Sequence, residues 1–228
     1  MERQREREAV LDAYTYEILS VREELDAAGR VRSRRAQRFE ATHVNGRPVR
    51  RLVAEDGRAL PAGRQAKEDE RARERAADLR LGQAARERAA IPISAILERY
   101  DFRAVAREAV EGRPAVVLDF APRPGDRDIQ GDAVLRRLSG RLWVDEAEQQ
   151  VVRADVRNTE PIKIGWGLGA SVSRVESRSE FRKVEGAAWV PWKSETLAEG
   201  RKLLVKSFRT RVTLSYSGFR AVRAAPGG

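Results

Sequence analysis

The segment Lys202-Leu-Leu-Val-Lys-Ser-Phe-Arg-Thr-Arg-Val-Thr-Leu-Ser-Tyr-Ser-Gly-Phe219 alternates between apolar and polar residues over most of its length. Successive side chains of a β-strand point to opposite faces, so this segment has one apolar face and one face for water. The same alternation recurs through most of residues 101–223, and this predicts a large, curved antiparallel sheet with an apolar concave side. The segments that show it are 102–110, 113–121, 138–144, 150–156, 171–184, 187–198 and 202–219.

Short turn signals separate these strands and three more in the N-terminal part of the chain. The N-terminal strands are predicted at 14–25, 30–44 and 47–54. Glycine after Asp, Asn or Glu suits tight hairpin turns, because it adopts positive φ without steric cost. Sequential hairpins make neighbours of consecutive strands, so we expect a meander of roughly nine to eleven strands. The hairpin signals are Asp26–Gly29, Asn45-Gly46, Asp56-Gly57, Glu111-Gly112, Asp145–Glu148, Glu185-Gly186 and Glu199-Gly200, and 122–133 reads as a loop.

Residues 61–100 interrupt the strand pattern and predict a helical insertion. The part from 61 to 90 is rich in Ala, Arg and Glu, with Leu79 and Leu81 as its large apolar residues. Such a polar helix is either a movable lid or a connection between the third and fourth strands. Residues 94–100 place several apolar side chains at helical spacing and predict a short helix that plugs the concavity. The predicted fold is therefore one domain over residues 1–228, mainly β, forming an unclosed β-barrel with helices across its concave face.

Composition narrows the possible partners and compartments. The 228 residues carry a net charge of +10, contain no cysteine and include one histidine. A basic chain suits nucleic acid or an anionic membrane surface, and the arginines concentrate locally at 30–38 and 47–51. Phe39 is the one aromatic residue in that region, which disfavours nucleic acid because stacking needs aromatic rings. The start of the chain does not read as a signal peptide, so we expect a periplasmic or envelope protein if a signal was removed upstream of Met1, and a cytoplasmic one otherwise.

Catalytic and metal-binding patterns are weak, and we expect no enzyme, no cofactor and no metal. His43 lies in the middle of a predicted strand, and no Gly-x-Ser-x-Gly motif accompanies it. Gly165–Ala170 matches Gly-x-Gly-x-x-Ala, but a dinucleotide loop must open a helix and here strand continues. These glycines more plausibly permit a bend where the sheet curls.

A resemblance to a known family rests on the segment Leu138-Ser-Gly-Arg-Leu-Trp-Val-Asp-Glu-Ala-Glu148. It resembles the Gly-x-(Leu/Val)-Trp-Ile-Asp strand and turn of bacterial outer-membrane lipoprotein-sorting proteins, the superfamily of the carriers LolA and LolB. Residues 117–122 and 186–191 are similar to the same group. The resemblance implies an unclosed β-barrel with helices across its opening, and a periplasmic carrier of lipid or lipoprotein acyl chains.

One parity of each strand would then line an apolar cavity for acyl chains, with the short helix closing over it. Each member could equally be ordinary core, and the third alternative is a scaffold whose core is filled. A nucleic-acid or other polyanion-binding module would instead use Arg34, Arg35, Arg50 and Arg51. Trp143 has the opposite parity from Leu142 and is expected on the convex face. The predicted cavity residues are Ile96, Leu97, Tyr100, Val116, Leu118, Phe120, Leu142, Val144, Val152, Val156, Leu204, Phe208, Val212 and Leu214.

Overall fold

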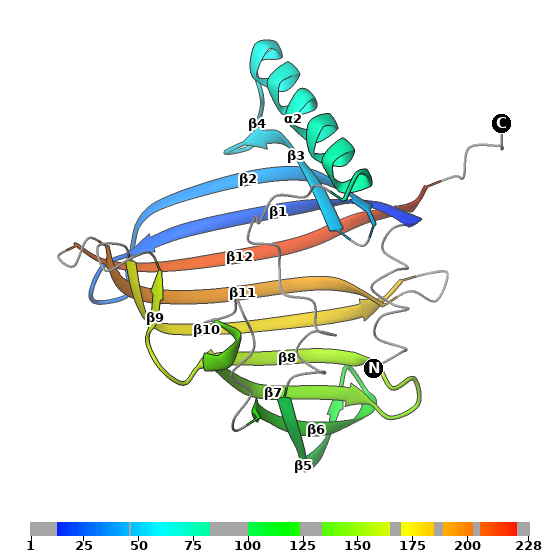
Figure 1. The fold of residues 1–228 in the computed structure, drawn as a ribbon, viewed down its shortest axis with the longest axis vertical. Helices are drawn as coiled ribbons and strands as arrows, with labels where there is room; N and C mark the ends of the chain where they lie inside the picture. Colours follow the sequence, from blue (N-terminus) through cyan, green and yellow to red (C-terminus); the bar gives the residue numbers. More distant parts are fainter. Residues whose placement is uncertain are drawn as a thin grey trace.

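The computed structural model describes residues 13–45, 47–82, 100–123, 134–164, 170–184, 189–202 and 206–222. These residues form one antiparallel sheet of 12 strands, with one long helix beside it (Figure 1). The elements in chain order are β1 (Tyr14–Leu25), β2 (Val31–Val44), β3 (Arg47–Glu55), β4 (Arg58–Ala59), α2 (Ala62–Arg80), β5 (Tyr100–Val110), β6 (Arg113–Pro122), η2 (Leu135–Arg137), β7 (Leu138–Asp145), β8 (Val151–Asn158), β9 (Ile162–Ile164), β10 (Ala170–Lys183), β11 (Trp189–Lys202) and β12 (Lys206–Ala221).

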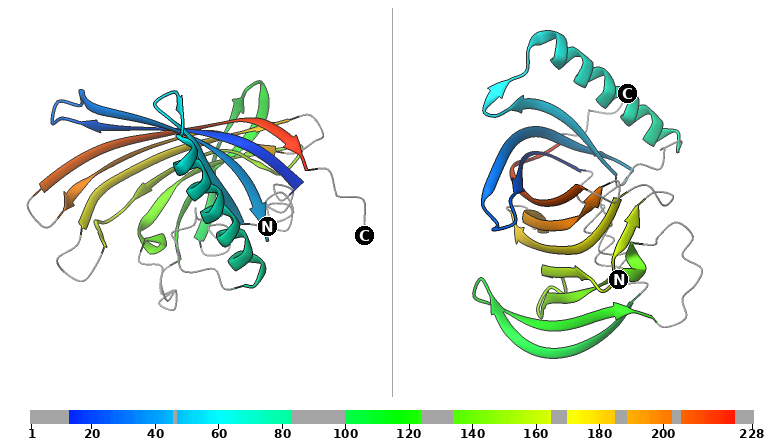
Figure 2. Two further views of the ribbon diagram at one scale, coloured as in Figure 1. Left: turned by 90° about the horizontal axis from the view of Figure 1, so that it is seen from above. Right: turned by 90° about the vertical axis from the view of Figure 1, so that its left-hand side faces the viewer.

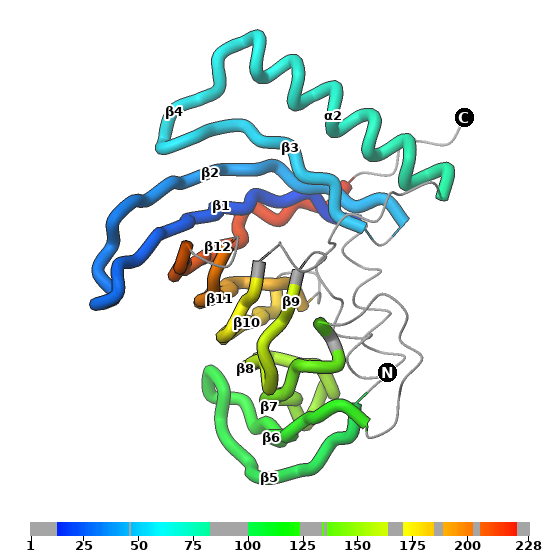
Figure 3. Tube along the Cα trace, turned by 60° about the vertical axis from the view of Figure 1, so that its left-hand side comes forward, coloured from blue at the N-terminus to red at the C-terminus, as the bar shows by residue number. Residues whose placement is uncertain are grey.

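The sheet is curved and unclosed, as predicted (Figure 3). Its strand order is β4-β3-β2-β1-β12-β11-β10-β8-β7-β6-β5, with β9 paired to β10, so β4 and β5 lie at opposite edges. The simple meander was wrong at one place, because β1 pairs with the last strand, β12. The segment from 60 to 99 therefore connects the two edges of the sheet, and does not join neighbouring strands.

Most predicted turns are confirmed by positive φ angles. The turn predicted at Glu199-Gly200 was wrong. Glu111 and Gly112 have φ of 50° and 78°, whereas Gly200 lies inside β11 opposite Phe208. A Cβ at Gly200 would overlap the carbonyl oxygen of Ser171 on β10 and crowd the Phe208 ring. This glycine permits close approach of two strands, so its presence in the sequence did not mark a turn.

Helix α2 lies alongside β3, the strand next to the edge strand β4 (Figure 2). The Arg51 guanidinium donates to Asp69 of the helix at 2.6 Å and to Glu40 of β2 at 2.5 Å. Near the C-terminal end of the helix, Leu79 is buried and its carbonyl accepts a hydrogen bond from the Asn45 side chain at 3.0 Å. The helix is thus held beside β2 and β3 by polar contacts and by the buried Leu79 side chain.

The second half of the predicted insertion differs from expectation where the structure describes it. Tyr100 is the first residue of β5 and not the end of a helix. Its side chain is almost fully buried, and its ring meets Phe120 edge-on at a centroid distance of 5.4 Å. Ile96 and Leu97 of the predicted plug lie outside the described residues, as does Leu204.

Strands β8 and β9 act as one interrupted neighbour of β10. Between them the Asn158 side chain accepts a hydrogen bond from the Val175 amide at 2.6 Å and donates to the Ser173 carbonyl at 3.0 Å. These bonds replace the backbone ladder where β8 has ended and β9 has not begun. A side-chain amide can do this because it carries both a donor and an acceptor.

Close approach of β7 to β8 generates the first testable prediction. Gly140 lies opposite Val156, and a Cβ there would overlap the backbone carbonyl of Asp155. We expect Gly140→Ala to lower the free energy of unfolding by about 2–4 kcal/mol, because backbone must shift. Gly63 in α2 has open space around it, so Gly63→Ala is the control and should be stabilising by about 0.5–1 kcal/mol. Urea unfolding followed by circular dichroism measures both, and equal stability of the two variants would contradict the assignment.

Candidate functional site

One face of the sheet carries two apolar clusters, one toward each side of the sheet. A register row runs across five strands through Leu142, Ala154, Ser179, Ser194 and Leu214, and residues directly opposite one another share a face. At one end of the row, Leu142 belongs to a cluster with Tyr100, Phe120, Leu138, Val151 and Ala154. At the other end, Leu214 packs against a cluster of Tyr16, Ile18 and Ala41.

Most of the predicted cavity residues lie on this apolar face. Phe120, Leu142, Val144 and Val156 meet Tyr100 in the first cluster. Val116 pairs with Val144 and Leu118 with Leu142, which places both on the same face. Phe208 and Val212 share the parity of Leu214 on β12 and lie on this face too.

Val152 is the exception, and the reason is a β-bulge. The pairing of β7 with β8 shifts register between Trp143 and Val144, so Val151 takes the position opposite Val144. Val152 is thereby turned to the other face, where it packs with Trp143 and Trp189. Trp143 lies on the opposite face from Leu142, as its parity predicted. A bulge of this kind leaves no signal in a simple alternation pattern.

Between the two apolar clusters runs a band of small hydroxyl side chains. Ser177 and Thr196 are hydrogen-bonded to each other at 2.9 Å, and Ser179 and Ser194 at 3.0 Å. All four are half-buried. Because each hydroxyl has a partner on the neighbouring strand, the band needs no ligand to satisfy its polar groups. The band therefore separates two clusters of large side chains by a strip of short ones.

The sheet also carries a hollow of about 880 Å³ whose lining is mainly charged. Phe120 and Val156 are the members of the predicted cavity set that line it. The charges are balanced, with five acidic and five basic side chains. The acidic ones are Asp119, Asp155, Glu176, Glu180 and Glu195, and the basic ones are Arg141, Arg157, Arg178, Lys193 and Arg211.

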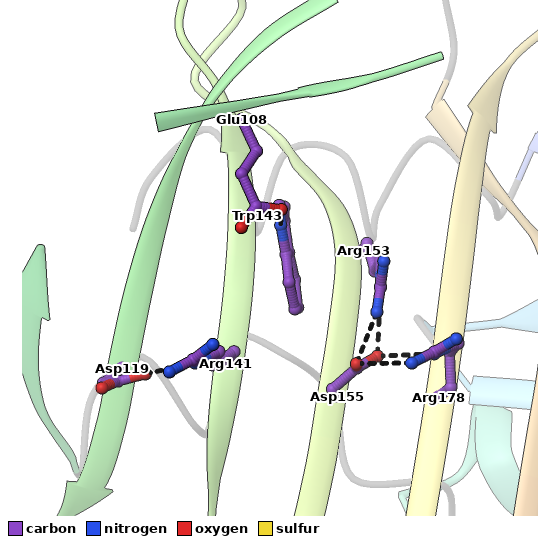
Figure 4. Close-up of polar contacts among 7 residues, drawn as sticks. All are labelled: Glu108, Asp119, Arg141, Trp143, Arg153, Asp155 and Arg178. Carbon is purple, nitrogen blue, oxygen red and sulfur yellow. Dashed lines mark hydrogen bonds and ion pairs between the residues drawn. The ribbon is translucent and has the colours of Figure 1, made fainter. Parts of the chain in front are cut away.

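These charges alternate in sign from strand to strand. One register row reads Asp119, Arg141, Asp155, Arg178, Glu195. Arg141 donates to Asp119 at 2.8 Å, and Arg178 and Arg153 both donate to Asp155 (Figure 4). Burial acts to raise the pKa of Asp155, but the hydrogen bonds from the two arginines outweigh it and hold that pKa below its ordinary value. The hollow therefore offers a charged ligand little excess charge of either sign.

The segments that carry the family resemblance meet on the face of the sheet opposite Leu142, where Val117, Trp143 and Trp189 share one buried cluster. Trp189 donates its indole N–H to Glu148 at 2.7 Å. Arg113 donates to Asp145 and to Glu148, both at 2.7 Å, and the Asp145 side chain is only 1% exposed. Asp145 also accepts the Glu148 amide at 2.8 Å and so closes the β7–β8 turn. The arrangement fixes two hairpins and a strand, which is a structural role.

The arginines proposed for polyanion binding are partly neutralised. Arg35 is paired with Glu55 at 2.7 Å, and Arg51 with Asp69 and Glu40. Arg34 and Arg50 are exposed. A polyanion would have to compete with protein carboxylates at two of these four positions, which weakens that interpretation.

Within the described residues, side chains suited to metal binding do not cluster. No cluster of three His, Asp or Glu side chains that could hold a metal occurs there. His43 lies beside Tyr16 with ring centroids 5.6 Å apart, and burial raises the pKa of the Tyr16 phenol, which keeps it neutral. Among the described helices, none is long and apolar enough to cross a membrane.

Comparison with known proteins finds similarity in fold but not in sequence. No family model and no curated protein matches the chain. An outer membrane lipoprotein-sorting protein domain from Vibrio parahaemolyticus has a TM-score of 0.46 and 13% identity, covering 98% of this chain and 92% of that one. A LolA superfamily protein from Nitrosomonas europaea has a TM-score of 0.44 and 11% identity, with coverages of 99% and 94%.

A third similar structure is a DUF1329 family protein from Desulfovibrio piger. Its TM-score is 0.44 and its identity 13%, covering 98% of this chain and 92% of that one. Such distant similarities carry no weight for function, which has to be inferred from this chain's own residues.

The buried Asp145 generates a prediction about acid stability. The Arg113 hydrogen bond, the largest influence, holds the Asp145 pKa below its ordinary value in the folded protein. This carboxylate therefore stabilises the fold above its unfolded pKa of about 3.9, and that contribution disappears as the pH falls through the lower folded value. We expect Asp145→Asn to lower the free energy of unfolding at neutral pH by about 1–3 kcal/mol.

The difference between wild type and Asp145→Asn should begin to shrink as the pH falls below about 4, and it should be lost once the pH is below the lower folded pKa, where Asp145 is protonated and uncharged like Asn. Unfolding by urea at neutral and acid pH measures it. Glu146 forms an exposed ion pair with Arg107 at 3.2 Å, so Glu146→Gln is the control and should change stability by less than about 1 kcal/mol. If Asp145→Asn were as stable as this control at neutral pH, the stabilising role assigned to the Asp145 carboxylate would be wrong.

Proposed function

We propose that this protein is a non-catalytic binding protein of the bacterial envelope that holds lipid or lipoprotein acyl chains against the apolar face of its sheet. The observation that carries the proposal is the band of Ser177, Ser179, Ser194 and Thr196 between two bulky apolar clusters on one face. An acyl chain lying over this band would contact apolar side chains on both flanks.

Binding of an acyl chain requires apolar surface area and no particular functional group. Each buried methylene contributes about 0.8 kcal/mol, and the interaction has no directional requirement. The paired hydroxyls suit this role, because they expose few unsatisfied polar groups to a bound chain. The charged hollow does not suit it, since methylenes laid over ion pairs would desolvate charges without replacing their water.

The proposed binding surface does not include the part of the predicted cavity formed by Tyr100 and Leu142. Tyr100 and Leu142 are 1% and 0% exposed, so their cluster is already filled by protein. Truncating Leu142 would leave a cavity and test stability before it tested binding. We therefore place the acyl chain over the hydroxyl band and beside Val212 and Leu214, which are half-buried.

Assignment to the envelope rests on the resemblance of residues 138–148 to lipoprotein-sorting proteins. The acyl chains of lipids and lipoproteins are the partners that this compartment would supply. Fractionation of cells that make the full natural protein would test the location, and recovery with the cytoplasmic fraction would contradict it.

The binding proposal predicts lipid on the gently purified protein. Organic extraction followed by mass spectrometry should recover an acyl-chain species, and native mass spectrometry should show its stoichiometry. Thr196→Trp fills the band and should lower the recovered lipid about tenfold or more, equivalent to at least about 1.4 kcal/mol.

Glu195→Trp is the matched control, because Glu195 is the next residue on β11 and points to the charged face. This variant should load as wild type does, and circular dichroism should show both variants folded. Absence of lipid from wild type after mild purification and after incubation with a fatty acid would refute the proposal. Equal loading of the two tryptophan variants would refute the assigned surface.

A further inference from the structure

One end of the sheet brings together the β1–β2 turn, the adjoining ends of β11 and β12, and β9 (Figures 1 and 2). The charged side chains of these segments are mainly basic. This end is termed the basic rim. Its members are Arg30, Arg32, Lys163, Arg201, Lys202, Lys206 and Arg209.

Strand register brings the basic rim together from segments far apart in sequence. Lys202 of β11 lies directly opposite Lys206 of β12. Ser171 of β10 lies between Lys163 of β9 and Arg201 of β11. On the other side, the Arg209 guanidinium reaches the carbonyl of Ala27 in the β1–β2 turn at 3.5 Å, which joins Arg30 and Arg32 to the same end.

The basic rim differs from the charged hollow in how its charges are balanced. Within the described parts of the chain, Arg32, Lys163, Arg201, Lys202 and Lys206 are exposed and have no carboxylate within ion-pair distance. Arg30 is paired with Asp26 at 2.9 Å, and Arg209 with Glu199 at 3.0 Å. Glu24, an exposed carboxylate near the turn, offsets a single positive charge. The charged hollow, by contrast, balances its arginines with acids.

We propose that the basic rim docks the protein onto an anionic lipid surface. Several unpaired cations along one end of a sheet match a plane of negative headgroups, which attracts each basic side chain within screening distance. Val31 is 50% exposed among these charges, and an apolar side chain there suits the headgroup boundary. This inference goes beyond acyl binding and does not depend on it.

The same residues fit nucleic acid less well. Binding of single strands needs aromatic rings free to stack on bases. Phe208 is the ring nearest these charges, and it is half-buried with the Lys202 ammonium 5.5 Å from its centroid. A lipid surface makes no demand for stacking, so the observed arrangement favours it.

The test measures binding of the full chain to vesicles of phosphatidylcholine and phosphatidylglycerol in equal parts, by co-sedimentation at low and high salt. The triple variant Arg201→Gln, Lys202→Gln, Lys206→Gln should bind about 100-fold more weakly than wild type. The control triple variant Lys67→Gln, Arg80→Gln, Arg220→Gln removes the same charge from exposed positions in α2 and the far end of β12, and should bind as wild type does.

Binding to anionic vesicles that is lost at high salt, absent with pure phosphatidylcholine and specific to the rim variant supports the inference. Equal weakening of the two triple variants would reduce the effect to net charge and overturn it. Preference for a single-stranded oligonucleotide over vesicles, with the same rim dependence, would overturn it in favour of nucleic acid. Acyl loading is measured on the same samples. Unchanged loading in the rim variant separates this result from that of the proposed acyl-binding function.

Discussion

The pairing of β1 with β12 is the interaction on which the rest of the fold depends. It joins the first described strand to the last, from Tyr14 opposite Ala221 to Glu24 opposite Thr210. It is the strand pairing that attaches the N-terminal hairpins to the C-terminal meander within the sheet. The pairing also places the two apolar clusters on one face. Leu214 of β12, which shares a register row with Leu142, lies opposite Ser20 of β1, and the row continues onto β1 through this pair. Contacts this distant in sequence form late and slowly in folding.

Local pattern predicted the strands, while register decided the site. Alternation placed Leu142 and Trp143 on opposite faces, because that property belongs to each strand alone. Alternation failed at Val152, where a bulge changes the face. The hairpin signal failed at Gly200, where the glycine serves an approach between strands. Both depend on the neighbouring strand, which a single segment of sequence does not specify.

The charged features were hidden for the same reason. The sequence shows a net charge of +10 with arginines in most segments, and only the clusters at 30–38 and 47–51 stood out. Folding divides these arginines into two kinds. Arg141 of the hollow faces Asp119 on the adjacent strand, whereas Arg201 lies between Ser171 and Ser207, next to the facing pair of Lys202 and Lys206. A uniform composition can thus yield one balanced and one unbalanced surface.

An unclosed sheet leaves backbone donors and acceptors free along its outer strands, which invites pairing with another copy of the chain. The edge at β5 interrupts its ladder with a bulge between Ala104 and Ala106, and carries exposed charges at Arg103 and Arg107. The opposite edge ends in the two-residue strand β4, with α2 beside its neighbour β3. Each border is thus too short, too bent or too charged to template a further strand. The barrel can stay open without polymerising.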